Sequence, residues 1–193
     1  MKLMIASDIH GSAYYCRKML EAYKREDADR LLLLGDILYH GPRNDLPKNY
    51  NPKEVIAMLN PMKQELLCVR GNCDTEVDQM VLEFPILADY CFIELDGHTI
   101  FATHGHHHNP ANPPMLKKGD ILVLAGSIPS SLSDSIYCEI MDYLKDKKLN
   151  IVVDATKDLL VNVLKFKPFL VKPNNHEIGE IFGVELKTRS EVV

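Results

Sequence analysis

The chain has 193 residues, of which 46% are hydrophobic and 25% are charged, and this composition excludes a disordered or fibrous protein. Such a length suits one domain or one and a half, and it allows a sizeable core to be buried. The formal net charge of -5 comes from 22 basic and 27 acidic residues without a Lys/Arg run, which argues against nucleic acid as a polymeric partner.

Cysteine usage and hydropathy indicate the compartment. Five cysteines are an odd number, and none of them forms a C-x-x-C pair, so a reducing environment is favoured over a disulfide framework. The apolar run at the N-terminus stops at Asp8, too early for a signal-peptide core. No apolar run approaches the length of a membrane span. We therefore expect a soluble, cytoplasmic protein with no membrane partner.

The first part of the chain is predicted to alternate short apolar strands with helices and polar loops. The run at 31–34 suits a buried parallel strand, and Asp96-Gly97 is typical of a hairpin turn. The expected strands are 2–7, 31–34, 66–69, 91–95, 99–103 and 121–124, and the expected helices are 13–25 and 53–59.

The second part has a more regular rhythm. Helices are expected at 134–146, 159–165 and 174–182, and strands at 151–153 and 169–171. Alternating strands and helices predict parallel βαβ units with right-handed crossovers. The sequence as a whole therefore predicts an α/β fold, without a flexible linker to mark a domain boundary.

Four polar motifs follow predicted strands in the first part. They are Asp8-Ile9-His10, Gly35-Asp36, Gly71-Asn72-Cys73-Asp74 and Thr103-His104-Gly105-His106. Ligands of parallel α/β sheets bind outside the carboxyl ends of the strands, where these side chains are expected. Asp and His donors suit manganese, zinc or iron, and Asp36 could bridge two ions. Two ions roughly 3.5–4 Å apart can clamp both oxygens of an in-line phosphoryl displacement.

The ordered motifs resemble the calcineurin-like metallophosphoesterase superfamily. Residues 35–44 together with 71–74 resemble its YfcE-type phosphodiesterases, and the similarity covers nearly all of residues 1–125. The resemblance implies two divalent ions, with manganese favoured over zinc, iron or magnesium, and a small phosphodiester or phosphate ester substrate.

The same resemblance implies roles for single residues. Asp8, His10 and Asp36 would hold the first metal, and Asp36, Asn72 and His104 would hold the second. Asp36, Asn72 and His104 would thereby also be catalytic. Asn72 would contact the substrate phosphate, as could His40 and Arg43 in the loop after Asp36. Cys73 receives no catalytic role. Many relatives in the superfamily have a His at this position that acts as a general acid, but the YfcE-type pattern has Cys there.

The resemblance breaks after the strand at 121–124. The family continues with Gly-His-Thr-His, whose histidines complete both metal shells, whereas Ala-Gly-Ser-Ile-Pro stands at 125–129. Each ion would lose one protein ligand, so activity is expected to be impaired. A histidine of the 106–108 loop could fill a vacant position, but we favour His107 and His108 as exposed loop residues. His98, beside the hairpin turn, is expected to be structural.

The last 70 residues resemble a different family, the phosphofructokinase-B group of the ribokinase superfamily. The motifs that carry this resemblance lie at 125–129, 153–156 and 172–177. In that family Asn174 and Glu177 would help to hold magnesium and nucleotide phosphate, with Lys172 beside them. The family's sugar-binding region is absent, and its Gly-rich anion hole with the catalytic Asp would lie beyond Val193. We therefore favour a scaffold, and leave weak nucleotide or sugar-phosphate binding open.

The chain thus looks like a chimera of two α/β parents joined in a strand that both folds share. We expect a metallophosphoesterase-like part at 1–125, whose missing C-terminal sheet is replaced by a kinase-like βαβα part at 126–193, packed as one domain. Whether the fusion is engineered, recombinant or an assembly error stays open. The predicted function is an impaired metal-dependent phosphoesterase, and the alternative is a non-catalytic chimera. Apolar surface left uncovered by the new strands could be buried in a homodimer.

Overall fold

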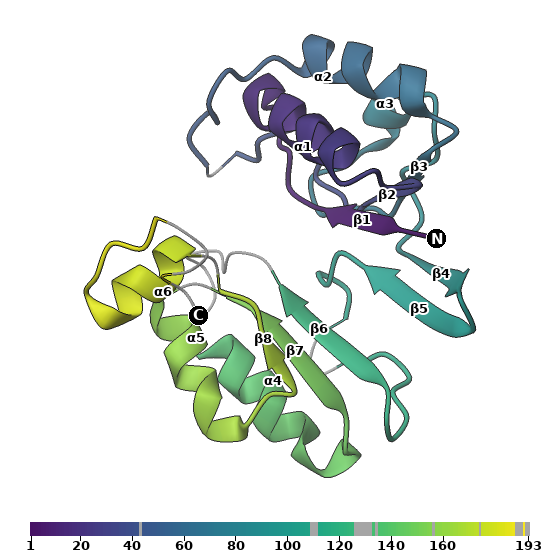
Figure 1. Cartoon of the computed structure of the whole chain (residues 1–193). Coiled ribbons are helices and arrows are strands. Elements are labelled where there is room, and N and C mark those ends of the chain that lie inside the picture. Colours follow the sequence, from purple (N-terminus) through teal and green to yellow (C-terminus); the bar gives the residue numbers. More distant parts are fainter. Residues whose placement is uncertain are drawn as a thin grey trace. The chain divides into compact units, whose positions relative to one another are not determined.

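A computed structural model describes residues 1–42, 44–108, 112–125, 133, 135–155, 157–173, 175–187 and 191. The chain divides into two compact units, Met1–His108 and Asn109–Val193, and both are α/β (Figure 1). The α/β prediction is therefore confirmed. Among the described residues, no helix combines the length and the apolar character that crossing a membrane requires.

The first unit is built on a parallel sheet of three strands in the order β1-β2-β3. These are β1 (Leu3–Ala6), β2 (Arg30–Leu33) and β3 (Leu66–Cys68). Three consecutive leucines of β2, from Leu31 to Leu33, are fully buried. A central strand that is covered on both faces needs apolar side chains in both directions, which explains the continuous apolar run.

Three helices and a short 3₁₀ helix accompany this sheet: α1 (Ala13–Arg25), α2 (Pro52–Leu59), η1 (Asn60–Met62) and α3 (Glu76–Gln79). Their N-termini are capped by short polar side chains. Ser12 accepts the Tyr15 amide, Asn51 accepts the Glu54 amide, and Thr75 with Asp78 forms a capping box. Residues of α1, α2 and the sheet share one core cluster.

A hairpin completes the first unit. Strands β4 (Tyr90–Leu95) and β5 (His98–Thr103) pair antiparallel around a turn in which Asp96 and Gly97 both have positive φ, 48° and 81°. A two-residue type I′ hairpin turn requires φ above zero at both central residues. Asp-Gly adopts these positive φ values at low energetic cost. The hairpin that the sequence predicts is confirmed.

The second unit has a parallel sheet in the order β6-β7-β8. Its strands are β6 (Ile121–Ala125), β7 (Asn150–Asp154) and β8 (Leu170–Val171), and its helices are α4 (Ile136–Leu144), η2 (Lys145–Lys147), α5 (Lys157–Val163), η3 (Leu164–Phe166) and α6 (Asn175–Phe182). The predicted alternation of strands and helices is therefore present. Helix boundaries differ from the predicted ones by about two residues, because terminal turns fray or tighten into 3₁₀ geometry.

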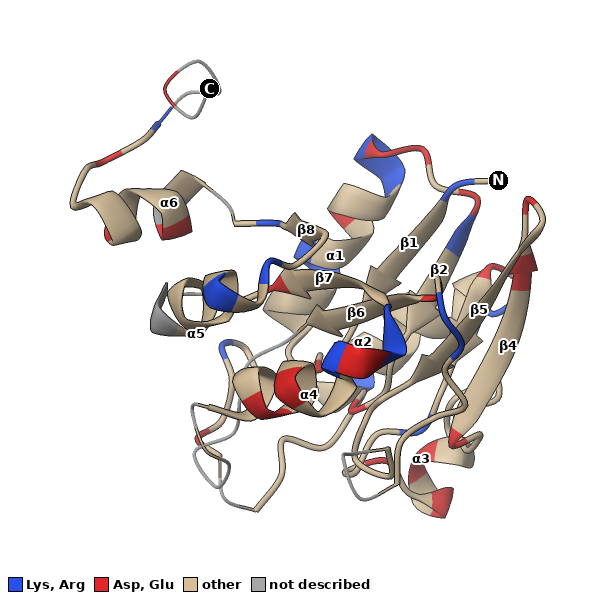
Figure 2. Ribbon diagram, turned by 90° about the horizontal axis from the view of Figure 1, so that it is seen from below, with Lys and Arg blue, Asp and Glu red and all other residues tan. Residues whose placement is uncertain are grey.

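The core of this second unit lies between the sheet and helices α4 and α5. Tyr137 and Met141 of α4 and Leu160 of α5 are buried with Val153 of the central strand. Acidic and basic residues are interspersed along the described elements of both units (Figure 2).

Candidate metal centre

Three of the predicted ligands occupy strained backbone positions just beyond parallel strands. Asp8 and His10 follow β1, Asp36 follows β2, and their φ values are 60°, 49° and 57°. The left-handed region costs a non-glycine residue roughly 1–2 kcal/mol. Three such residues at one sheet edge indicate a functional constraint, because strain of this kind persists where the surroundings hold a site in shape.

A buried carboxylate fixes the two loops that carry this strain. Asp74 is 1% exposed, and its oxygens accept the backbone N–H groups of Asp36, Ile37 and Gly71 at 2.8, 2.9 and 2.8 Å. These three charge-assisted hydrogen bonds join the loop after β2 to the loop after β3. The sequence motif contains Asp74, but its pattern did not indicate this role.

Two glycines permit the close approach of the same loops. A Cβ on Gly71 would lie 2.1 Å from Oδ1 of Asp36, and a Cβ on Gly35 would lie 2.2 Å from the Gly71 nitrogen. No side chain fits at such distances, so these positions require glycine. Contact between the two loops is therefore the reason for glycine at both positions.

Asp36 is the central side chain of the site and is 2% exposed. Its Oδ1 accepts the backbone N–H of Cys73 at 2.7 Å. Its Oδ2 lies 3.6 Å from Nε2 of His10 and 3.8 Å from Nε2 of His104. Burial raises the pKa of Asp36, and the Cys73 N–H and the nearby imidazoles oppose this rise. One carboxylate oxygen therefore lies between two imidazole nitrogens.

Both imidazoles are oriented from behind by the backbone. Nδ1 of His10 lies 2.7 Å from the Tyr39 carbonyl oxygen, and Nδ1 of His104 lies 2.7 Å from that of Leu34. A carbonyl oxygen can only accept, so each Nδ1 carries a proton and each Nε2 is the nitrogen that a metal ion in the site could bind. Metal-binding histidines are held in this way in proteins.

The donor set fits a cation. Nε2 of His104 lies 3.1 Å from Oδ1 of Asn72, and Nε2 of His10 lies 3.2 Å from Oδ1 of Asp8. With Nδ1 protonated, each pair places two acceptors face to face, which is repulsive unless a proton or a metal ion lies between them. The hydrogen bond with Asp8, opposed by burial, raises the pKa of His10 to about 9. The pKa of Asp8 is lowered overall. Burial alone would raise it, but hydrogen bonds with His10 and Ser7 outweigh that effect.

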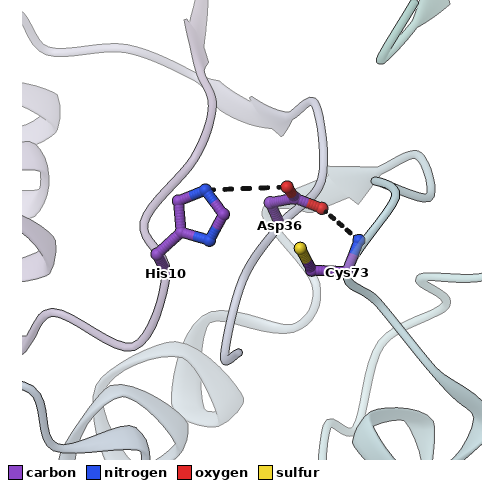
Figure 3. A group of neighbouring side chains, drawn as sticks. All are labelled: His10, Asp36 and Cys73. Carbon is purple, nitrogen blue, oxygen red and sulfur yellow. Dashed lines mark hydrogen bonds and ion pairs between the residues drawn. The ribbon is translucent and has the colours of Figure 1, made fainter. Parts of the chain in front are cut away.

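Among the described residues, two groups of side chains bring ligand atoms within 4.8 Å of one another. One is Asp8, Asp36 and His104, and the other is His10, Asp36 and Cys73 (Figure 3). The structure thus assembles the predicted ligands around a shared Asp36, with Asn72 beside His104. It adds Cys73, which the sequence analysis had set aside. Burial and the negative charge of Asp36 raise the pKa of the Cys73 thiol to about 12.

The remaining histidines lie outside these groups. The His40 ring packs edge-on against Tyr39 and Tyr50, with centroid distances of 4.9 and 5.1 Å. Nε2 of His107 lies 3.7 Å from Oδ1 of Asp89, and its side chain is about half exposed. His98 is exposed in β5. Neither of the two ligand groups found in the described part of the chain includes a histidine of the 106–108 loop. Arg43 lies outside the described residues.

The kinase-like residues lie in the second unit. Nζ of Lys172 is 3.0 Å from Oδ2 of Asp154, so an ion pair joins the carboxyl ends of β7 and β8. Glu177 belongs to the first turn of α6, and Asn174 lies outside the described residues. The structure therefore describes two of these three predicted residues.

Comparison with known families follows the same division. Residues 1–127 match the calcineurin-like phosphoesterase superfamily domain, and residues 87–193 match the pfkB family of carbohydrate kinases. The chain belongs to both families. Both resemblances that the sequence motifs indicate are therefore confirmed, and the two matches overlap over residues 87–127, which include β4, β5 and β6.

Individual relatives agree with this assignment to the phosphoesterase and pfkB families. Phosphodiesterase YfcE of Escherichia coli K12 is 49% identical over 123 residues, covering 64% of this chain and 67% of the relative. A solved structure of Yfce, described as a phosphoesterase from E. coli, superimposes with a TM-score of 0.61 over 64% of this chain and 68% of that one. The 1-phosphofructokinase of Bacillus subtilis is 45% identical over 78 residues, 40% of this chain but only 26% of the kinase.

Proposed function

We propose that the cluster at the carboxyl ends of β1, β2 and β3 binds two divalent metal ions and hydrolyses a small phosphodiester or phosphate ester. The position of Asp36 Oδ2, between Nε2 of His10 and Nε2 of His104, carries this proposal. A carboxylate oxygen is suited to bridge a pair of ions when it lies between two imidazoles whose rings are oriented by hydrogen bonds to backbone carbonyls. The E. coli relative is a phosphodiesterase by name, which supports the class of reaction.

The chain's own residues position the reactants. Bound ions would supply electrophilic stabilisation of the phosphoryl oxygens and a nucleophilic water at neutral pH. Asp36 would contact both ions, and Asp8 and His104 would be further ligands. Asn72 is exposed beside His104, which supports a contact between its amide and the substrate phosphate. His40 and Arg43 are retained as proposed phosphate contacts.

We further propose that manganese supports this activity and that turnover is lower than in intact relatives. The sequence has Ala-Gly-Ser-Ile-Pro at 125–129, where the resemblance calls for two more histidine ligands. An ion with fewer protein ligands is held more weakly, and weaker occupancy lowers the rate at a given metal concentration. Metal content of the purified protein distinguishes a working centre, with two ions per chain, from a scaffold with none.

The function is tested by replacing the bridging carboxylate. Asp36→Asn keeps the size of the side chain but removes the charge, so manganese-stimulated hydrolysis of a chromogenic phosphodiester should fall at least about 100-fold, beyond the 10–100-fold cost of losing an outer-shell partner. Asp142→Asn, on the exposed surface of α4, is the matched control and should retain the full rate. Equal rates in the wild-type protein and Asp36→Asn would refute the proposal and favour the non-catalytic chimera.

A further inference from the structure

Cys73 is the side chain of the cluster that the proposed function leaves without a role. Its Sγ, one nitrogen of His10 and one oxygen of Asp36 all lie within 4.8 Å of one another (Figure 3). We propose that the Cys73 thiolate is a direct ligand of the ion held by His10 and Asp36, so that one half of the centre is a Cys-His-Asp site. This inference rests on the proposed metal dependence, and it adds a ligand that the sequence pattern did not suggest.

The backbone holds the sulfur in place from both sides. The N–H of Cys73 donates to Oδ1 of Asp36 at 2.7 Å, and the next residue, Asp74, anchors the loop through three backbone amides. A Cβ on Gly41 would lie 3.4 Å from Sγ, so Gly41 packs close to the sulfur. Because its loop is tied to the same Asp36 that would bind the ion, the backbone of Cys73 keeps its position relative to that carboxylate.

The distance between the nitrogen and oxygen donors suits a small tetrahedral ion. Ligands bound to zinc at about 2.0–2.1 Å lie roughly 3.3 Å apart in a tetrahedron. Nε2 of His10 and Oδ2 of Asp36 are 3.6 Å apart, so a shift of a few tenths of an ångström would let them share an ion. Nδ2 of Asn72 donates to Sγ at 3.2 Å, which leaves further lone pairs of the sulfur available.

The chemistry of the two ligand groups differs in a way that makes this proposal specific. The group of Asp8, Asp36 and His104, with the Asn72 oxygen beside it, is rich in hard oxygen donors. The group that contains Cys73 has one soft donor, and soft thiolate ligands favour zinc or cobalt over manganese. Binding would release the thiol proton to solvent as the sulfur–metal bond forms, with no change of oxidation state. The two positions should therefore differ in their preferred metal.

Cobalt substitution gives a readout that is independent of turnover. A thiolate bound to Co²⁺ produces a strong sulfur-to-metal charge-transfer band in the near ultraviolet, whereas oxygen and nitrogen ligands alone produce only weak d–d bands. Titration of the metal-free full chain with Co²⁺ should produce this band. Cys73→Ser should abolish it while the d–d bands persist, and zinc affinity should fall roughly 100-fold. Cys138→Ser is the matched control, because Cys138 lies in the second unit and should leave both readouts unchanged.

The outcomes separate this inference from the proposed function. Cobalt bound without a charge-transfer band, or a band that survives in Cys73→Ser, overturns the role of Cys73 and leaves the phosphodiesterase proposal standing. A band that depends on Cys73 in a protein without hydrolytic activity supports the ligand and contradicts the enzyme. Failure to bind cobalt at all also overturns the role of Cys73, while manganese-stimulated hydrolysis decides the phosphodiesterase proposal separately. Circular dichroism that matches the wild type shows that Cys73→Ser is folded, and the spectra then report on the ligand itself.

Discussion

Asp74 determines the geometry of the site without belonging to either ligand group. Its carboxylate accepts three backbone amides from two loops in a fully buried setting. Asp74→Asn would turn one acceptor into an NH₂ group that faces these amide donors, so the buried network loses charge-assisted bonds. We expect the free energy of unfolding to fall by about 2–4 kcal/mol.

Urea denaturation followed by circular dichroism measures this change. Asp142→Asn again serves as the control and should change the stability by less than about 0.5 kcal/mol, since it alters an exposed helix position. A loss of similar size in both variants would show that the three-amide clamp is unimportant.

His10 predicts a pH dependence of the metal-free protein. Its pKa is about 9 in the folded chain against a usual value near 6.5, chiefly because of the hydrogen bond with Asp8. A raised pKa means that the folded state binds the proton more tightly. The resulting stabilisation is complete below about pH 6.5 and is lost as pH rises through about 9. In denaturation at pH 6 and pH 9.5 in the presence of a chelator, His10→Gln should lose this difference. A wild-type pH profile unchanged in His10→Gln would contradict the shift.

At the level of residues, the sequence predicted the side chains that could bind metal but not those that hold them. Asp8, His10, Asp36, Asn72 and His104 have the chemistry of ligands and follow strands, so pattern and spacing were enough to propose them. The clamp of Asp74 and the contact of Cys73 depend on how two loops meet across the sheet edge. Nothing in the local sequence encodes that distance, and Cys73 was given no catalytic role because the YfcE-type pattern has Cys at this position.

The loops after β2 and β3 act as one element because glycine lets them touch. Gly71→Ala adds a carbon that would lie 2.1 Å from Oδ1 of Asp36, and the contact is too short to relax without moving the carboxylate. We expect a loss of metal binding together with about 2 kcal/mol or more of stability. Isothermal titration with Mn²⁺ measures the binding.

A second glycine variant distinguishes steric displacement from general destabilisation. A Cβ on Gly97 meets no atom within 4 Å, although its φ of +81° makes alanine unfavourable by roughly 1–2 kcal/mol. Gly97→Ala should therefore be less stable yet bind metal normally. If both variants lost metal to the same extent, the loss would follow from stability rather than from the position of Asp36.

At the level of elements, strand positions and the hairpin turn could be predicted from the sequence, and the short helix α3 could not. The leucine run of β2 and the Asp-Gly turn each carry a strong local rule, which the structure follows. Helix α3 has four residues, which is too few for a periodic hydrophobic pattern. Its capping box was recognised in the structure, where it starts the helix directly after the loop that follows β3.

The whole molecule joins two families through a shared α/β architecture, and its second unit carries only a fraction of a kinase. The matched segment spans 26% of the B. subtilis enzyme, and Lys172 is already paired with Asp154. We expect calorimetry with magnesium-ATP at millimolar concentration to show no binding heat, because a small part of the nucleotide cradle does not provide enough contacts. Measurable heat that disappears in Lys172→Ala would instead assign nucleotide binding to this unit.

The second sheet leaves apolar side chains in solvent. Ile121, Val123 and Leu170 are 62%, 58% and 53% exposed, and the register aligns Val123 with Val152 and Val152 with Leu170 along one face. Both α4 and α5 contribute to the core with the opposite side chains of the sheet. The homodimer expected from the sequence stays a prediction, and this face is the surface that it would use.

The position of the ligand atoms along the chain has a consequence for descent. All residues of the two ligand groups lie between Asp8 and His104, inside the unit that ends at His108. A genetic crossover downstream of this unit leaves every one of these donors, and the Asp74 clamp that holds them, in the same reading frame and the same fold. This upstream part of the ligand set can therefore be inherited as a block, while the downstream histidine pair is lost with the sequence that the crossover replaces.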